Sequence, residues 1–223
     1  MRNNSSISNP FSITSYIGKE FFCDRIHETE NLSNALHSRR NVTLISPRRI
    51  GKTGLIHHLF QNIPSKEANC FYVDLYSTTN LRDFTKALAE EVLTKRITPF
   101  SERVWSEITH FFGSLRPVFG ADPISGMPQC TIDIQPQREE WTLQQIFAYL
   151  EKSDIPCYIA LDEFQQITEY KDVKMEALLR THIQQLNNVH FIFAGSKKHV
   201  MTQMFASAKR PFYNSTQIMN IEV

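Results

Sequence analysis

Glycine is scarce in this chain, with only 7 among 223 residues. A loop that needs glycine for close backbone approach or unusual backbone angles must therefore be confined to one place. Consecutive apolar residues form only short runs, and none approaches the ~18 residues that a membrane-spanning helix requires. The polar start, Met1 to Ser6, lacks the apolar segment of a secretory signal. The sequence therefore predicts neither secretion nor a membrane partner.

Cysteines are also few, and charge of one sign is not in excess. Cys23, Cys70, Cys130 and Cys157 are too far apart in sequence to form a metal clip or a CxxC pair. This usage suits a reducing compartment, so we predict a cytoplasmic location. The 24 Lys and Arg residues balance 23 Asp and Glu, which gives a net charge of +1. Such a chain is not expected to bind nucleic acid over its whole surface, although a local basic patch is compatible with it.

The length and the apolar content, 41% of residues, are typical of one good-sized globular domain. Short apolar runs that read as strands alternate with segments of helical periodicity. The expected strands are 41–45, 70–75, 157–161, 190–194 and 216–223. The expected helices are 24–40, 52–61, 81–92, 104–112, 139–152, 175–186 and 200–205.

This alternation predicts an α/β fold in three layers, with helices on both faces of a central, mostly parallel, five-stranded sheet. The strands are continuous apolar runs, as burial on both faces requires. Residues 1–15 are rich in Asn and Ser and are expected to form a flexible arm before a core of residues 16–223. Residues 114–138, which contain several prolines and glycines, predict an excursion such as a hairpin rather than a domain boundary.

The stretch 46–53, Ser-Pro-Arg-Arg-Ile-Gly-Lys-Thr, lies between an expected strand and an expected helix. It matches the phosphate-binding P-loop, GxxxxGK[ST], except that Ser46 stands at the first glycine. Gly51 would let the backbone approach phosphates, and Lys52 would reach the β- and γ-phosphates of a nucleotide. The Thr53 hydroxyl would ligate Mg²⁺. A strand–turn–helix that contains Gly-Lys-Thr by chance is the alternative.

The rest of this loop supplies further candidate nucleotide-binding positions. Arg48 and Arg49 are predicted to face phosphate or a partner subunit, and the alternative is that both are solvated. The other loop positions that would surround the phosphates are Pro47, Ile50 and Gly54.

Two adjacent carboxylates, Asp162 and Glu163, follow the apolar run 157–161. The carboxyl ends of parallel strands meet at one edge of a sheet, where ligands of α/β folds bind. Asp162 would hold Mg²⁺ and Glu163 would act as the general base that polarises the attacking water. Their alternative role is an acidic helix start. Ser196, at the end of the strand 190–194, would sense the γ-phosphate, or else it is a turn serine after a glycine.

Together these motifs resemble the archaeal-type P-loop ATPase family, which groups with the AAA+ and STAND ATPases. The resemblance covers residues 16–221, including an N-terminal box at 16–30 and the Asp-Glu-Phe-Gln segment after the strand 157–161. It implies ATP and Mg²⁺ as cofactors, and adenine contacts from Asp24 and Arg25 in that box. Phe22 would pack on the adenine, or alternatively belong to the core. The family continues into a winged-helix module, which would lie beyond Val223 and through which DNA or a protein would bind.

Two departures from the family pattern bear on activity. Ser46 replaces a glycine, and Tyr213 is followed by Asn214 where the family often has Gly-Arg. Arg210 is a substitute for that arginine or a solvated surface residue. The sequence therefore predicts a Mg²⁺-dependent ATPase that is slow in isolation and acts as a nucleotide-driven switch, with a protein effector or self-association. The alternative is a non-hydrolysing nucleotide-binding scaffold that regulates a DNA-binding or effector module.

Overall fold

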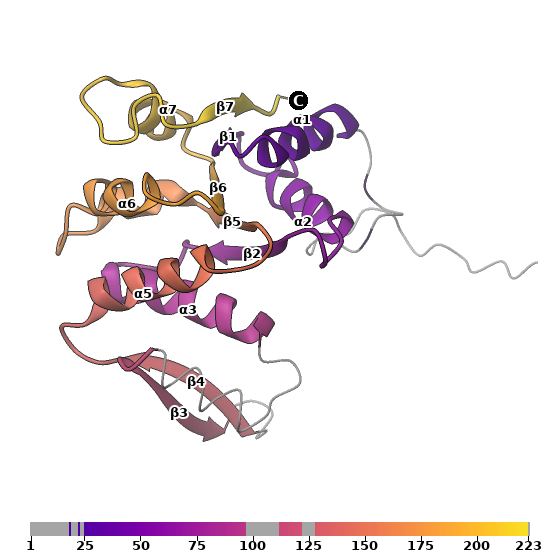
Figure 1. Cartoon of the computed structure of the whole chain (residues 1–223). Coiled ribbons are helices and arrows are strands. Elements are labelled where there is room, and N and C mark those ends of the chain that lie inside the picture. Colours follow the sequence, from indigo (N-terminus) through magenta and orange to yellow (C-terminus); the bar gives the residue numbers. More distant parts are fainter. Residues whose placement is uncertain (1–17, 19–21, 23–24, 97–111, 122–127, 223) are drawn as a thin grey trace, which may run out of the picture.

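A five-stranded parallel sheet forms the centre of the computed structural model (Figure 1), which describes Gly18, Phe22 and residues 25–96, 112–121 and 128–222. The strand order is β2-β5-β6-β1-β7, and every pairing in this sheet is parallel. The predicted fold class is confirmed. The strands are β1 (Val42–Ile45), β2 (Asn69–Asp74), β5 (Cys157–Asp162), β6 (Val189–Gly195) and β7 (Gln217–Asn220).

Helices pack on both faces of this sheet and complete the three layers. One apolar cluster joins the sheet to α1 (Ile26–His37) and α2 (Lys52–Asn62). The other apolar cluster joins the opposite face to four helices. These are α3 (Leu81–Arg96), α5 (Glu139–Glu151), α6 (Met175–Ile183) and α7 (Lys198–Ala206). None of the helices in the described part of the chain has the length and apolarity needed to cross a bilayer.

The strand β5 shows why its sequence is apolar throughout. Cys157, Ile159 and Leu161 belong to the cluster under α3 and α5, whereas Tyr158 and Ala160 belong to the cluster under α1 and α2. Successive side chains of a strand point to opposite faces, so a strand covered on both sides has no polar face.

Strand order brings the three predicted motifs together at one edge of the sheet. Strand β6 lies between β1 and β5, and Ile45 at the end of β1 is paired with Gly195 at the end of β6. The P-loop after β1, Ser196 after β6 and the carboxylates at the end of β5 therefore emerge side by side.

The excursion at 114–138 is an antiparallel hairpin of β3 (Leu115–Ala121) and β4 (Pro128–Ile134), as predicted. The buried side chains of Ile132 and Ile134 join the cluster under α3 and α5. The predicted arm 1–15 and nearly all of the predicted helix 104–112 lie outside the described residues.

One element was not predicted, the short 3-10 helix η2 (Phe164–Glu169) directly after the carboxylates. Phe164 is fully buried, with its ring centroid 4.6 Å from that of Phe193 and 5.7 Å from that of Phe212. This aromatic packing fixes the chain where it leaves β5, and so it fixes the turn that carries Glu163.

Candidate active site

The P-loop takes the backbone conformation that its glycine allows. Gly51 has a φ of 81° in the left-handed region and caps the N-terminus of α2, where its carbonyl accepts the Leu55 N–H at 2.8 Å. Arg49 also has a positive φ, 66°, which is uncommon for a residue with a side chain. The helix N-terminus and its unpaired amides form an environment that favours anions.

Lys52, at the start of α2, is buried although it is charged, with 6% of its surface exposed. Its ammonium forms an ion pair with Asp162 Oδ1 and lies 3.6 Å from Glu163 Oε1. The structure therefore brings together the P-loop lysine and both carboxylates, as the sequence predicted from residues 110 positions apart.

Asp162, at the end of β5, accepts hydrogen bonds on both carboxylate oxygens. Lys52 and the Glu163 backbone N–H, at 2.8 Å, donate to Oδ1. The Thr53 hydroxyl, at 2.7 Å, and the Tyr72 hydroxyl, at 2.8 Å, donate to Oδ2. Burial alone would raise the pKa of Asp162, but the charge of Lys52 and these donors outweigh it and lower the pKa below its ordinary value. Asp162 is therefore held as a carboxylate.

Tyr72 was missed by the sequence reasoning. It lies within the predicted strand 70–75, which is a mostly apolar run. A tyrosine inside a strand that is buried on both faces usually needs a hydrogen-bond partner, and this was the available signal.

Glu163 is held by side chains from its own turn and from the neighbouring strand. Its Oε2 accepts hydrogen bonds from Ser196 Oγ, at 2.9 Å, and from Gln165 Nε2. Glu163 itself has a φ of 53°, which turns the chain sharply out of β5. The predicted neighbourhood of Glu163 and Ser196 is thus observed, and Gln165 is a second partner that the sequence reasoning missed.

Gly195 permits this arrangement by close approach rather than by an unusual backbone angle. A Cβ at this position would lie 2.5 Å from both Gln165 Oε1 and Met201 Sδ. Gln165 is 3% exposed, so it has little room to move. A glycine at 195 is therefore required for Gln165 to reach Glu163.

A cavity of about 440 Å³ lies at the carboxyl edge of the sheet, between the P-loop, Glu163 and Ser196. Most of the predicted site residues line it, and so does Tyr76, an exposed aromatic residue that was not predicted. The cavity is lined by Pro47, Arg48, Arg49, Gly51, Lys52, Thr53, Tyr76, Glu163 and Ser196.

Of the remaining predicted nucleotide-binding residues, the four that the structure describes do not line this cavity. Phe22 stacks on the ring of His58 with centroids 3.7 Å apart, and Arg25 pairs with Glu28 at 2.6 Å. Ile50 packs against the cluster under α1 and α2, and Gly54 lies within α2. The other member of the set, Asp24, lies outside the described residues. An adenine role for these residues stays a prediction.

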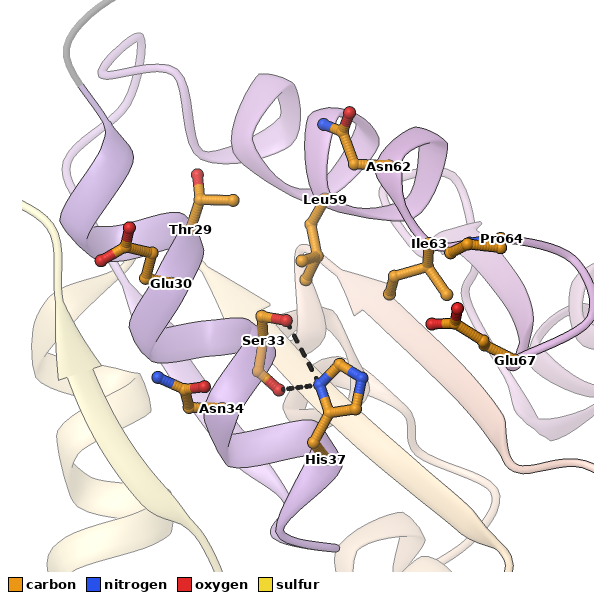
Figure 2. Close-up of a pocket in the computed structure, with 10 residues that line it drawn as sticks. All are labelled: Thr29, Glu30, Ser33, Asn34, His37, Leu59, Asn62, Ile63, Pro64 and Glu67. Atoms are coloured by element: carbon orange, nitrogen blue, oxygen red, sulfur yellow. Dashed lines mark hydrogen bonds between the residues drawn. The ribbon is translucent and has the colours of Figure 1, made fainter.

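A second hollow, of about 410 Å³, lies between α1 and the far end of α2 (Figure 2). There His37 Nδ1 donates to the Ser33 carbonyl at 2.8 Å, and the lining includes Glu30 and Glu67. This hollow holds two carboxylates and none of the P-loop groups, so it is separate from the phosphate site.

The two departures from the family pattern have clear places in the structure. Ser46 is fully buried, its φ is not positive, and its hydroxyl has no hydrogen-bond partner in the described part of the chain. The serine therefore keeps an ordinary backbone angle. Arg210 binds the Glu176 carboxylate through Nε, at 3.0 Å, and through Nη2. Its side chain is 30% exposed, and it is not among the described residues that line the cavity.

The oxygen atoms near the P-loop fit a magnesium ion that accompanies a nucleotide. Mg²⁺ prefers hard oxygen ligands and commonly takes only one or two from the protein, the rest being phosphate and water. Thr53 Oγ1 and Asp162 Oδ2 are in contact at 2.7 Å, and Thr53 is exposed beside the cavity. Across the described ranges no cluster of three or more His, Cys, Asp or Glu side chains could hold a metal by itself.

Comparison with known proteins agrees with this site. Residues 35–202, most of the chain, match the AAA domain family. The chain belongs to the AAA domain family. The matched segment contains the P-loop, both carboxylates and Ser196, so the predicted kinship with archaeal-type P-loop ATPases is confirmed. No curated protein matches the sequence significantly.

Solved structures of AAA-type ATPases share the fold of this AAA domain. The chain superposes on a Walker-type ATPase of Pyrococcus abyssi with a TM-score of 0.59 and 17% identity, covering 95% of this chain and 57% of that one. For the ORC2 protein of Aeropyrum pernix, solved in ADPNP–ADP complexes, the TM-score is 0.57 at 16% identity, with 90% and 48% covered. For the ORC1 protein of the same organism, solved with DNA, it is 0.55 at 15% identity, with 90% and 45% covered. The chain thus spans about half the length of these proteins.

Proposed function

We propose that this AAA domain binds ATP together with Mg²⁺, hydrolyses the γ-phosphate and uses its nucleotide state as a switch. One observation supports this most strongly. A buried P-loop lysine, Lys52, is held by the two adjacent carboxylates Asp162 and Glu163 beside one cavity. Three groups with the complementary roles of phosphoryl transfer are therefore already within reach of one another.

Each of these side chains has a distinct role in the proposal. Lys52 and the amides at the start of α2 bind the phosphates. Thr53 and Asp162 hold Mg²⁺, which supplies charge neutralisation on the phosphate oxygens when it is bound. Glu163 takes a proton from the attacking water, and Ser196 keeps the Glu163 carboxylate beside the γ-phosphate position.

A second candidate function is a nucleotide-binding scaffold that does not hydrolyse ATP. Two observations favour it: the serine at position 46, and the engagement of Arg210 by Glu176. An arginine that stabilises transition-state charge accelerates such reactions by orders of magnitude. The arginines of the described cavity lining are Arg48 and Arg49, both within the P-loop. We therefore propose slow turnover in the isolated chain.

The exposed side chains around the cavity also indicate where a partner protein would bind. Arg48, Arg49 and Tyr76 are exposed at the cavity, where a protein effector or a second copy of the chain could contact the nucleotide. The similar ORC1 protein of Aeropyrum pernix was solved with DNA, but this chain spans 45% of it. We accordingly propose that DNA would bind through a module outside this domain, and that the domain acts in the cytoplasm.

Single-turnover hydrolysis of radiolabelled ATP, with protein in excess and Mg²⁺ present, separates the two candidates. A switch ATPase releases phosphate in the absence of any partner, even if slowly. A scaffold retains intact ATP over the same period although the nucleotide is bound, and adding double-stranded DNA does not change this.

A further inference from the structure

Tyr72 connects the edge strand of the sheet to the candidate magnesium site. It lies on β2, paired in register with Ala160 of β5, so its side chain is on the same face as that of Asp162 two residues further along β5. Its hydroxyl donates to Asp162 Oδ2 at 2.8 Å. Neither the P-loop nor the Asp-Glu turn contains this residue.

The four donors to Asp162 differ in whether they would keep their hydrogen bond when a nucleotide binds. Lys52, which donates to Oδ1, has to leave the carboxylate in order to reach phosphate oxygens. Thr53, which donates to Oδ2, lies at the cavity and would also contact the cation. Tyr72 and the Glu163 backbone N–H have no such second task.

The Tyr72 phenol is fixed in place and remains a donor. Its ring packs against that of His57 on α2, with centroids 4.3 Å apart. Because a carboxylate can only accept, the hydroxyl must donate its proton to Asp162.

We propose that Tyr72 is a positioning residue that holds the Asp162 carboxylate in place for the divalent cation while Lys52 transfers to the phosphates. This inference rests on the proposed function. Outer hydrogen-bond partners of metal ligands orient those ligands, and their removal commonly weakens metal binding by about 10- to 100-fold. Tyr72 therefore sets the affinity for the cation without touching the nucleotide.

The test is the substitution Tyr72→Phe, which removes the hydroxyl and keeps the ring on His57. Mn²⁺ replaces Mg²⁺ as the probe, and its binding to the protein–ADP complex is followed by electron paramagnetic resonance. We expect Mn²⁺ affinity to fall about tenfold. ADP affinity measured in EDTA should stay at the wild-type value. Tyr158→Phe is the matched control, since Tyr158 lies on β5 on the same sheet face and donates nothing to Asp162. It should leave both affinities unchanged.

A double-mutant cycle with Asp162→Asn separates positioning from a general effect on the fold. If Tyr72 acts through the Asp162 carboxylate, adding Tyr72→Phe to Asp162→Asn should change Mn²⁺ affinity less than about twofold. Wild-type Mn²⁺ affinity in Tyr72→Phe, or an equal loss in the Asp162→Asn background, would overturn this inference alone. A wild-type chain that binds no ADP with or without Mn²⁺ would instead overturn the proposed function, and the inference with it.

Discussion

Two of the lysine–carboxylate pairs in this AAA domain, Lys52–Asp162 and Lys95–Glu91, differ mainly in burial. Lys52 and Asp162 meet at the carboxyl edge of the sheet with only 7% and 3% of their side chains exposed. Lys95 and Glu91 meet on α3 at 2.8 Å with 46% and 25% exposed. The first pair lies beside the cavity, and the second lies along the free edge of β2.

The exposed pair covers the backbone of an edge strand. Glu91 Oε1 accepts a hydrogen bond from the Tyr72 backbone N–H at 2.9 Å, and Lys95 Nζ donates to the Cys70 carbonyl at 2.6 Å. These two backbone groups face away from β5, the strand that pairs with β2. Charged side chains on an edge strand discourage pairing with another chain. The pair therefore satisfies backbone groups at the open edge of the sheet.

The buried pair of Lys52 and Asp162 is suited to a change of partners when a ligand binds. Desolvation offsets much of the attraction between two buried charges, so the pair adds little net stability, whereas a single charge left behind is costly. Under the proposed function, phosphates that bind Lys52 would therefore have to arrive with a cation for Asp162. The comparison teaches that burial, more than the chemistry of the pair, distinguishes a site poised for a ligand from a structural contact.

Lys52→Met should produce the largest effect on the empty protein. It leaves the carboxylates of Asp162 and Glu163 close together with no cation between them. We expect the free energy of unfolding in urea at pH 7 to fall by about 3–5 kcal/mol. A loss below about 1 kcal/mol, which is typical of surface ion pairs, would show that the buried pair behaves no differently from the exposed pair.

Lowering the pH should reduce the difference in the free energy of unfolding between Lys52→Met and the wild type. In the wild type the pKa of folded Asp162 is below its unfolded value of about 3.9, so its stabilisation persists above pH 4 and is lost below it. Without Lys52, burial dominates and raises the pKa of Asp162 in the folded variant. Asp162 therefore takes up a proton between pH 7 and about pH 4, and this reduces the loss of stability in the variant. Urea unfolding at several pH values in this window tests the sign. If the difference in the free energy of unfolding stayed constant or grew as the pH fell, Asp162 would not be the group whose protonation matters.

Lys95→Met should have the smallest effect. Exposed ion pairs contribute about 0–1 kcal/mol, and Glu91 still accepts the Tyr72 backbone N–H after the substitution. We expect the free energy of unfolding to change by no more than about 1 kcal/mol, and by less in 1 M salt. The same urea experiment measures this change. A loss of stability comparable to that of Lys52→Met would mean that burial does not distinguish the two ion pairs.

Most of the fold could be predicted because its signals are local. Apolar runs, helical periodicity and the loop 46–53 are each read within a few residues. Within the described part of the chain they led to observed strands, helices and a turn, whereas the helix predicted at 104–112 lies almost wholly outside it. The 3-10 helix η2 could not be predicted in this way. It depends on the packing of Phe164 against Phe193 and Phe212, which are distant in sequence.

The site was predictable only where its motifs are contiguous. Lys52, Asp162 and Glu163 belong to recognisable strings, and the structure brings them together. The contacts of Tyr72 with Asp162 and of Gln165 with Glu163 were missed. Tyr72 reaches Asp162 only because β2 is the neighbour of β5, and strand order is not written in any local pattern. Gln165 reaches Glu163 through the turn that η2 fixes, beside Gly195.

Glu163→Gln is the decisive test of the proposed general base. Its matched control is Glu169→Gln, at the end of the 3-10 helix that follows Glu163, because Glu169 is exposed and pairs with Lys197. ATP affinity and single-turnover phosphate release are measured for both variants and for the wild type. We expect Glu163→Gln to bind ATP as the wild type does and to release phosphate at least about 100-fold more slowly, the loss expected for a general base. Glu169→Gln should leave both quantities unchanged. Phosphate release by Glu163→Gln at the wild-type rate would contradict the account.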